Sequence, residues 1–307
     1  MHQNSPIQPL LPHHESSSPK EGSEHKIPPS VNFHLTKYCN MRCKFCYATF
    51  EDLGRVKHDL ERSRKIITLL AEAGFEKLTF AGGEPTLVKE LPELAKLAKG
   101  LGLVTTIVTN GANLMGRDYY NELVPHLDWV ALSIDSLSHE SNLASGRHLA
   151  RKKVLHREEC EGLAKQLKDD GVKLKINTVV SAFNHQEDLT EFINTCLPTR
   201  WKLLQALFVE GQNSKFQGEF EVSGDEFKAF IDRHEGIDSR VKIVPEEVDL
   251  IKGSYIMLNP LGEFYDNNGA AYRYSKSILE VGVRTALEEI DFDWQKFFDR
   301  GGKYTWK

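Results

Sequence analysis

Three cysteines stand close together in the segment "KYCNMRCKFCYATF", residues 37 to 50. They are Cys39, Cys43 and Cys46, so their spacing is Cys-x3-Cys-x2-Cys. Three thiolates can bind three irons of a [4Fe-4S] cluster and leave the fourth iron open to another molecule. A structural zinc site normally has four protein ligands, often as two cysteine pairs, and no second pair follows here. The spacing therefore favours an iron–sulfur cluster with one open iron, and a catalytic zinc on three cysteines is the alternative.

The composition limits the compartment and the class of partner. Five cysteines, an odd number, fit a reducing compartment better than a disulfide framework. The formal net charge of -5 argues against a general nucleic-acid binder, which would show a basic excess. No apolar run approaches the roughly 18 to 20 residues of a membrane-spanning helix, and the N-terminus has no signal-peptide core. These features predict a cytoplasmic protein without membrane attachment.

The chain divides into three predicted parts. Residues 1–28 are rich in Pro, Ser, His and charge without apolar periodicity, which predicts a disordered leader. In residues 29–212 strand-like runs, turns and helical stretches alternate, and residues 213–307 form a C-terminal extension. The strand candidates are 31–36, 77–83, 104–111, 129–135, 172–180 and 200–209, and helices are expected at 60–73 and 156–170. Six βα units predict an α/β fold with a parallel sheet, either curled or open.

The strand faces favour a curled sheet, a partial (βα)6 TIM-like barrel. Asn32 in the first strand, and Lys175 and Asn177 in the fifth, alternate with apolar residues. A strand of an open doubly wound sheet is covered on both faces and is apolar throughout. One polar face therefore predicts a lumen that holds a polar ligand. Lysines in such a lumen, Lys175, Lys202 and Lys77, need an anion unless they reach water at the strand ends.

The cysteine spacing, with aromatic Phe45 before the last cysteine, resembles the signature of the radical S-adenosylmethionine (SAM) superfamily. In that superfamily the open iron binds SAM, and reduction cleaves SAM to a 5′-deoxyadenosyl radical. The sequence "GGEP" after the second strand resembles the motif that meets the SAM amino group, and barrel active sites collect at such strand ends. The resemblance implies these SAM-binding residues: Tyr47, Gly82, Gly83, Glu84, Asn110, Ser133 and Arg147. Taken singly, the last three could instead be turn or capping residues.

Further segments resemble the viperins, a family of antiviral radical SAM enzymes. In chain order they are "VNFHLTKYCNMRCKFC", "AGFEKLTFAGGEP", "LKINTVVSAFN", "RWKLLQALFVEGQN", "SKSILEVGV" and "RGGKYTW", within residues 29–306. The resemblance implies a dehydratase that acts on a ribonucleoside triphosphate. The 4′ hydrogen is removed, the 3′ hydroxyl leaves as water, and one electron and one proton complete a 3′-deoxy-3′,4′-didehydro nucleotide. Such a product terminates the chains that viral polymerases make.

A triphosphate also fits the lysines on the polar strand faces, because it carries several negative charges. The resemblance implies these nucleotide-binding residues: Asn32, Lys77, Lys175, Asn177, Lys202, Arg300, Gly301, Gly302 and Lys303. In "RGGK", residues 300–303, two glycines between two cations predict a nest of backbone N–H groups for phosphate oxygens. The alternative is that these residues only end the helix predicted in "WQKFFDR".

Two residues are predicted to act in catalysis. Tyr255 matches a viperin active-site tyrosine that orients the ribose or supplies the final hydrogen, and the alternative is an ordinary core tyrosine. Lys77 is a candidate to protonate the departing hydroxyl, with a bound water or the substrate itself as alternatives.

Departures from the viperin pattern bear on the base and on the partners. Ala81 stands where many viperins have serine. The loop 267–271 is neutral and small where the vertebrate counterpart is basic, so a pyrimidine triphosphate is expected, with a shift from CTP toward UTP if this loop meets the base. The protein is expected to be a monomer, and its implied partners are an electron donor and the iron–sulfur assembly machinery. Vertebrate viperins contact the assembly machinery through a terminal tryptophan, and this chain ends earlier, at Lys307, which puts the second partner in doubt. The other candidates are a radical SAM enzyme acting on GTP or another nucleotide, and a non-catalytic zinc-binding module.

Overall fold

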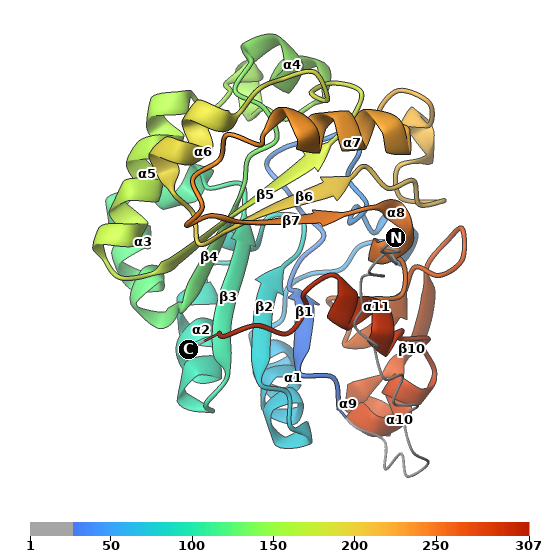
Figure 1. The fold of residues 1–307 in the computed structure, drawn as a ribbon. Helices are drawn as coiled ribbons and strands as arrows, with labels where there is room; N and C mark the ends of the chain where they lie inside the picture. The colour runs from blue at the N-terminus through green and yellow to red at the C-terminus, as the bar shows by residue number, and fades with distance from the viewer. Residues whose placement is uncertain (1–26, 307) are drawn as a thin grey trace, which may run out of the picture.

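One ten-stranded sheet organises the computed structural model, which describes residues 27–306. The strand order is β10-β9-β8-β1-β2-β3-β4-β5-β6-β7. Every neighbouring pair from β8 to β7 in this order is parallel, and β9 and β10 add an antiparallel edge. The sheet is curved (Figure 1). It does not close into a barrel, because its edge strands β10 and β7 do not pair with each other. The predicted α/β partial barrel is confirmed, while most of the predicted leader, residues 1–26, lies outside the described residues.

The elements have the following bounds. The strands are β1 (Ser30–His34), β2 (Lys77–Ala81), β3 (Val104–Thr109), β4 (Trp129–Ser133), β5 (Lys173–Val180), β6 (Arg200–Gln205), β7 (Lys242–Glu246), β8 (Met257–Leu258), β9 (Glu263–Asp266) and β10 (Arg273–Ser277). The α-helices are α1 (Leu60–Ala73), α2 (Leu91–Gly100), α3 (Arg117–Leu123), α4 (His139–Ala144), α5 (Arg157–Asp169), α6 (Thr190–Cys196), α7 (Gly224–Arg233), α8 (Val248–Ile251), α9 (Ile278–Val281), α10 (Val283–Glu288) and α11 (Trp294–Asp299). Short 3₁₀ helices are η1 (Glu51–Leu53), η2 (Pro85–Leu87), η3 (Ala112–Met115), η4 (Val124–His126), η5 (Ala150–Lys152) and η6 (Ser214–Phe216). None of the helices within residues 27–306 combines the length and apolarity that crossing a membrane requires.

Helix α1 shows how local sequence sets the ends of an element. The Asp59 carboxylate accepts a hydrogen bond from the Arg62 N–H at 2.9 Å and so caps the first turn. Gly74 ends the helix with φ 103, a left-handed conformation that glycine adopts without strain. Between these ends Ile66 and Leu70 are fully buried against the sheet. The helix therefore has the predicted bounds.

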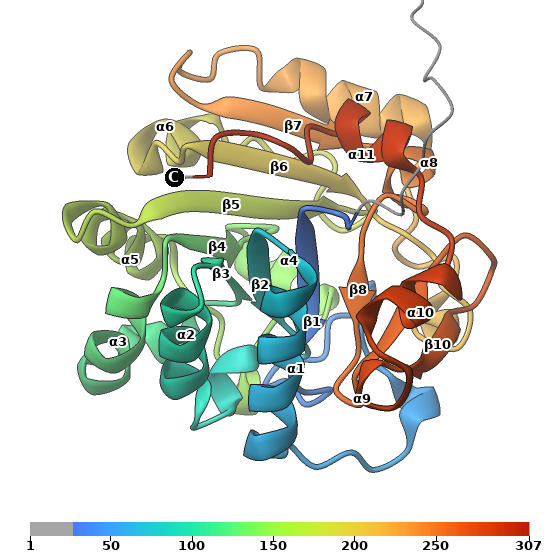
Figure 2. The ribbon, with the colours of Figure 1, turned by 90° about the horizontal axis from the view of Figure 1, so that it is seen from below.

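Alternation along the strands separates a polar lumen from an apolar outer layer. On β5, Leu174 and Ile176 belong to the main apolar core, whereas Lys175 and Asn177 line the lumen. Figure 2 looks at the molecule from below and shows α1, α2, α3 and α5 on the outer side of the curved sheet. The helices thus bury the apolar strand face, and the predicted polar inner face is confirmed.

The C-terminal extension adds strands to both edges of the predicted sheet. Strand β8 pairs with β1, with Met257 opposite Asn32. Strand β7 pairs with β6, with Glu246 opposite Leu204. Residues of the extension can therefore reach the lumen from either edge of the six strands that the sequence predicted.

The segment after α11 lies across the N-terminal ends of the strands. Trp306 is buried in an apolar cluster with Val104 and Trp129. The Trp129 indole N–H donates to the Trp306 carbonyl oxygen at 2.9 Å. Figure 1 shows this dark red segment passing across β2 and β3. The tail therefore lies at the end of the lumen opposite the cysteine loop, which follows the C-terminal end of β1.

Candidate active site

A cavity of about 270 Å³ fills the lumen of the partial barrel. It extends from the cysteine loop to the lysines near the strand starts. Lys303 is exposed and is not among the lining residues. All other predicted site residues line the cavity: Asn32, Cys39, Cys43, Cys46, Tyr47, Lys77, Gly82, Gly83, Glu84, Asn110, Ser133, Arg147, Lys175, Asn177, Lys202, Tyr255, Arg300, Gly301 and Gly302. One cavity therefore contains both the residues expected to bind SAM and those expected to bind a nucleotide.

Glycines allow the "GGEP" turn to approach the cysteine loop closely. A Cβ atom on Gly82 would lie 2.5 Å from the carbonyl oxygen of Thr36. A Cβ atom on Gly83 would overlap the carbonyl group of Tyr38. The Gly83 N–H instead donates to the Thr36 carbonyl oxygen at 2.6 Å. Larger residues would push the two loops apart, so these glycines fix the position of the loop that carries the cysteines.

The three thiols are partly buried and lie beside hydrogen-bond donors to sulfur. Burial raises the pKa of Cys43 to about 12 and that of Cys46 to about 11. Donors oppose this effect: Arg147 Nη1 lies 3.8 Å from Cys43 Sγ, and the Met41 N–H donates to Cys39 Sγ at 3.4 Å. Hydrogen bonds to sulfur and low solvent exposure are what the protein supplies to an iron–sulfur cluster, so these residues fit the group. Within residues 27–306 no group of three or more His, Cys, Asp and Glu side chains is arranged to hold a single metal ion. A cubane cluster does not need such a group, because each of its thiolates binds a different iron.

Glu84 ties the "GGEP" turn to the end of β3. Its carboxylate is 1% exposed and accepts hydrogen bonds from the Thr86 N–H and hydroxyl, at 3.1 and 2.7 Å. It also accepts from the Thr109 hydroxyl at 2.7 Å and the Asn110 N–H at 2.8 Å. Burial raises the pKa of Glu84, although these donors act in the opposite direction. The Asn110 amide donates in turn to Asn40 Oδ1 at 2.7 Å, so one network joins the turn, β3 and the cysteine loop.

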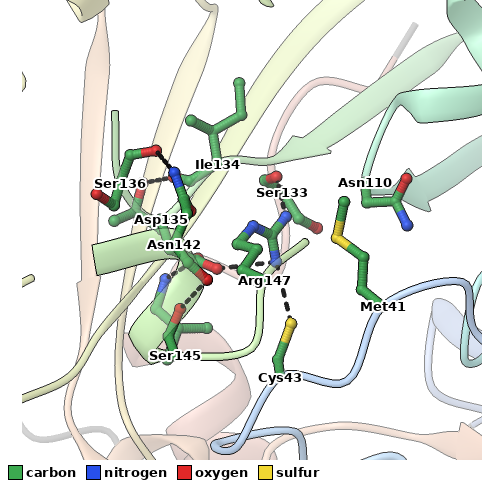
Figure 3. A network of polar contacts seen from close by, with 12 residues as sticks. Met41, Cys43, Asn110, Ser133, Ile134, Asp135, Ser136, Asn142, Ser145 and Arg147 are labelled. Atoms are coloured by element: carbon green, nitrogen blue, oxygen red, sulfur yellow. Dashed lines mark hydrogen bonds and ion pairs between the residues drawn. The ribbon is translucent and has the colours of Figure 1, made fainter. Parts of the chain in front are cut away.

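Arg147 joins the cysteine loop to the end of β4 (Figure 3). Its guanidinium forms an ion pair with Asp135 at 2.9 Å, donates to the Ser133 carbonyl oxygen and contacts Cys43 Sγ. Burial opposes the charge, but the Asp135 carboxylate and the Cys43 sulfur hold the pKa of Arg147 above its ordinary value. A permanent cation therefore lies between the cysteine loop and the lumen.

Lys77 and Lys175 form a cationic group near the strand starts. Their side chains belong to residues that are 5% and 8% exposed, and their Nζ atoms donate to the Tyr304 hydroxyl at 2.7 and 2.9 Å. Within residues 27–306, neither Nζ has a carboxylate at ion-pair distance. Burial and then the neighbouring cations lower the pKa of Lys77 to about 7 and that of Lys175 well below its ordinary value. Arg200 adds a third cation, 4.0 Å from the Tyr304 ring centre. Buried cations without a counter-charge are typical of a site for an anion.

Lys202, Tyr255 and Glu246 form a second polar group, one pleat further along the strands. Glu246 is fully buried, and its carboxylate lies 2.7 Å from Lys202 Nζ. The Tyr255 hydroxyl donates to Glu246 and accepts from Lys202, and the Arg300 guanidinium stacks 3.6 Å from the Tyr255 ring centre. Burial would raise the pKa of Glu246, yet Lys202 and Arg300 lower it, and burial lowers the pKa of Lys202 to about 8. Tyr255 is therefore held by specific polar contacts at the cavity wall.

The predicted nest of N–H groups in residues 300–303 is not formed. The Gly301 N–H donates to the Phe298 carbonyl oxygen at 2.9 Å, and the Gly302 N–H donates to that of Phe297 at 2.8 Å. Both carbonyls belong to α11, and Gly301 has φ 66, as at many helix ends. The nest prediction was wrong and the helix-end alternative is correct, because the helix satisfies its own last carbonyl groups with these donors.

The loop expected at the nucleobase contributes Asn267 to the cavity wall. Asn267 is 4% exposed, and its Oδ1 accepts from the Gly253 N–H at 3.1 Å. Farther along the loop, the Ala270 carbonyl oxygen accepts from the Glu210 N–H at 2.8 Å. Ala81, at the end of β2, also lines the cavity.

Asp135, Arg200, Glu246 and Tyr304 belong to this site although the sequence analysis did not select them. Arg200 could have been found, because it lies two residues before Lys202 on one face of the same strand. Asp135 follows the end of β4, where active-site residues collect. No local pattern marks Glu246 or Tyr304, since both reach the site through tertiary packing.

Fold and site together define a radical SAM protein. The description "Radical SAM superfamily" applies to the family whose profile matches residues 33–196. Among solved structures, native anSMEcpe with bound AdoMet has a TM-score of 0.66 and 14% identity, covering 89% of this chain and 82% of that chain. At this identity the likeness shows the fold alone. Proteins of this superfamily use a [4Fe-4S] cluster and SAM, the two groups that the cysteine loop and its surroundings fit.

Curated relatives narrow the family. An S-adenosylmethionine-dependent nucleotide dehydratase of Lacinutrix mariniflava is 45% identical over 94% of this chain, which spans 60% of that relative's length. One of Flammeovirga pacifica is 42% identical over 93% of this chain and 98% of its own. The S-adenosylmethionine-dependent nucleotide dehydratase RSAD2 of Danio rerio is 34% identical over 96% of this chain and 83% of its own. The chain therefore belongs to the viperin family of radical SAM enzymes.

Proposed function

We propose that this protein is a nucleotide dehydratase that converts a pyrimidine ribonucleoside triphosphate, UTP or CTP, to its 3′-deoxy-3′,4′-didehydro analogue. The observation that carries this proposal is the pair of buried ammonium groups, Lys77 and Lys175, in the same cavity as the cysteine loop. A polyanion there would supply the missing counter-charge. The names of the curated relatives support a nucleotide as that polyanion. The product would act as an antiviral chain terminator.

The end of the cavity at the cysteines is assigned to the cofactors. Cys39, Cys43 and Cys46 would hold the cluster, which together with SAM would supply the radical chemistry for removal of the 4′ hydrogen. Gly82 and Gly83 leave room for the amino-acid part of SAM, and Glu84 fixes their turn. The remaining SAM contacts are assigned to these residues: Tyr47, Asn110, Ser133 and Arg147.

The other end is assigned to the triphosphate. Lys77, Lys175 and Lys202 line it with Arg300, and their positive charges would meet the phosphate oxygens. Asn32 and Asn177 provide neutral donors on the same lumen face. The C-terminal extension, residues 213–307, closes the substrate site around the core of residues 29–212, as the positions of Tyr255 and Arg300 support. Gly301 and Gly302 border this end without donating to phosphate, because their N–H groups are bound to α11, and Lys303 is assigned a place outside the cavity.

Protein groups position the sugar and move protons during the reaction. Loss of the 3′ hydroxyl as water needs a proton, and we assign Lys77, which is charged when the triphosphate is bound, as its source through a neighbouring water or phosphate. That proton and one electron complete the product. Tyr255 has a hydroxyl that Glu246 and Lys202 orient, so we assign it the orientation of the ribose or the supply of the final hydrogen as this proton. Burial of this network keeps water away from the reacting carbon.

The base and the partners belong to the same proposal. The Oδ1 atom of Asn267 is occupied by Gly253, which leaves its amide N–H groups to donate to a carbonyl oxygen of a pyrimidine. An electron donor is required for each turnover. We further propose that the protein works in the cytoplasm as a monomer without membrane or nucleic-acid attachment, and that the iron–sulfur assembly machinery supplies the cluster.

An anaerobic turnover assay tests the proposal. The iron–sulfur-reconstituted protein is incubated with SAM, dithionite and each of CTP, UTP, GTP and ATP, and the products are identified by mass spectrometry. The expected result is 5′-deoxyadenosine together with a pyrimidine nucleotide lighter by one water. Slow 5′-deoxyadenosine formation with all four nucleotides, and no dehydrated product, would overturn the substrate assignment. Lys175→Ala should raise the KM for the nucleotide and leave SAM binding unchanged.

A further inference from the structure

The Tyr304 hydroxyl occupies a defined position among the cations of the cavity. It accepts hydrogen bonds from Lys77 Nζ at 2.7 Å and Lys175 Nζ at 2.9 Å, from two different strands. Its ring packs edge-on against Trp129, with 5.5 Å between ring centres, and against the Arg200 guanidinium at 4.0 Å. The ring contacts restrict the hydroxyl to one place between the two lysines.

The backbone of the tail strengthens this placement. Two residues beyond Tyr304, the Trp306 carbonyl oxygen accepts from the Trp129 indole at 2.9 Å and from Lys173 Nζ at 3.2 Å. Trp306 itself is 6% exposed. Tyr304 therefore lies between an anchored tryptophan and the end of α11, and it cannot move freely away from the lysines.

The Tyr304 hydroxyl needs a hydrogen-bond acceptor in addition to the two lysines. A phenol oxygen accepts two hydrogen bonds and donates one. When an anion keeps Lys77 and Lys175 charged, both ammonium groups can only donate, so they occupy both acceptor positions of Tyr304. The Tyr304 proton then has to be donated to something else, and an oxygen of the bound anion is the acceptor that the cavity brings near.

The direction of the strands identifies which phosphate of the nucleotide lies at Tyr304. Lys77 is the first residue of β2, and the "GGEP" turn follows the last. Lys77 lies four residue steps before Ala81, about 13 Å along the strand. The reacting sugar must lie near the cysteine end, so the phosphate at Tyr304 is the one farthest from the sugar.

We propose that Tyr304 is a phosphate-binding residue that holds Lys77 and Lys175 in register and donates its O–H to the terminal phosphate of a nucleoside triphosphate. This inference rests on the proposed function and deepens it, because it makes Tyr304 a determinant of phosphate-chain length. A diphosphate held by the same sugar contacts stops short of this group. The enzyme therefore prefers triphosphates over diphosphates.

Calorimetric binding to the holoenzyme tests this role. The wild type and Tyr304→Phe, loaded with cluster and SAM but without reductant, are titrated with UTP, UDP, CTP and CDP. A hydrogen bond to a charged group corresponds to roughly a 10- to 100-fold change in a binding constant. We expect Tyr304→Phe to weaken triphosphate binding by about that factor and diphosphate binding by less than about threefold. The SAM affinity and the melting temperature should stay unchanged, which a general structural defect would not allow.

Tyr120→Phe is the matched control, because it also removes a hydroxyl that donates to a side chain, Asp170 at 2.7 Å, but outside the lumen. It should alter no nucleotide affinity. Equal triphosphate affinity in Tyr304→Phe and the wild type, or an equal loss for di- and triphosphates, would overturn the role of Tyr304 while the proposed function stands. A wild type that binds di- and triphosphates equally well contradicts the inference without any variant. A wild type that binds neither UTP nor CTP refutes the proposed function itself.

Discussion

Nucleotide affinity should fall steeply with rising pH, because burial favours the uncharged form of the lysines in the free site. Burial and neighbouring cations lower the pKa of Lys77 from 10.5 to about 7. A bound triphosphate reverses both effects and returns this pKa toward its ordinary value. The complex then binds more protons than the free protein, so affinity is greatest at low pH and is lost as the pH rises toward the pKa of the bound state.

The size of the effect follows from the same shift. Above about pH 7.5 the phosphates are fully ionised, since their last pKa is near 6. From there to about pH 9.5, uptake of one proton by Lys77 weakens binding about tenfold per pH unit, or about 100-fold in all. Lys175, whose pKa is also lowered, makes the slope steeper.

Calorimetry of UTP binding to the unreduced holoenzyme, in two buffers of different ionisation enthalpy, measures this proton uptake directly. Lys77→Arg should flatten the profile, because a guanidinium stays charged throughout this range. Lys168→Arg on α5, whose Nζ donates to a backbone carbonyl outside the cavity, is the matched control. A dissociation constant that does not change from pH 7.5 to 9.5, with no proton uptake, would refute the reasoning and show that the lysines are already charged in the free site.

Three further predictions address other parts of the site. Glu246→Gln removes the carboxylate that lies 2.7 Å from the buried Lys202 ammonium group. The free energy of unfolding, measured in urea, should therefore fall by about 3 to 5 kcal/mol. A fall of less than about 1 kcal/mol would show that this ion pair contributes little to stability. Gly83→Ala places a Cβ atom into the cysteine loop and should lower the iron content after reconstitution several-fold. The control Gly162→Ala has open space around the new Cβ atom and should not change the iron content. Equal iron contents in the two variants would argue against close packing of the loops. Tyr255→Phe should bind UTP with little change but form less dehydrated nucleotide for each 5′-deoxyadenosine, and an unchanged product ratio in mass spectrometry would exclude its hydroxyl from the reaction.

Local patterns in the sequence determined much of the framework. Alternation of polar and apolar residues marked the lumen face of β5, because side chains of a strand point to opposite sides whatever the rest of the fold is. The predicted bounds of α1 were right because its ends depend on local contacts of Asp59 and Gly74, since caps act within one turn. The cysteine spacing and "GGEP" were readable for the same reason, because each is a short segment whose chemistry needs neighbouring residues.

Only the tertiary structure decided which residues after position 212 reach the cavity. Glu246 and Tyr304 reach the lysines from β7 and from the tail, and Tyr304 is separated by 129 positions from Lys175. In "RGGK", the local sequence was compatible with both a phosphate nest and a helix end. In the structure the backbone N–H groups of the two glycines donate to carbonyl groups of α11, so the segment is a helix end. Short-range patterns fix where a side chain points, but which groups meet across a long loop depends on the packing of the whole sheet. The sequence alone therefore specified the cofactor chemistry, and the fold decided which residues surround the lysines at the other end of the cavity.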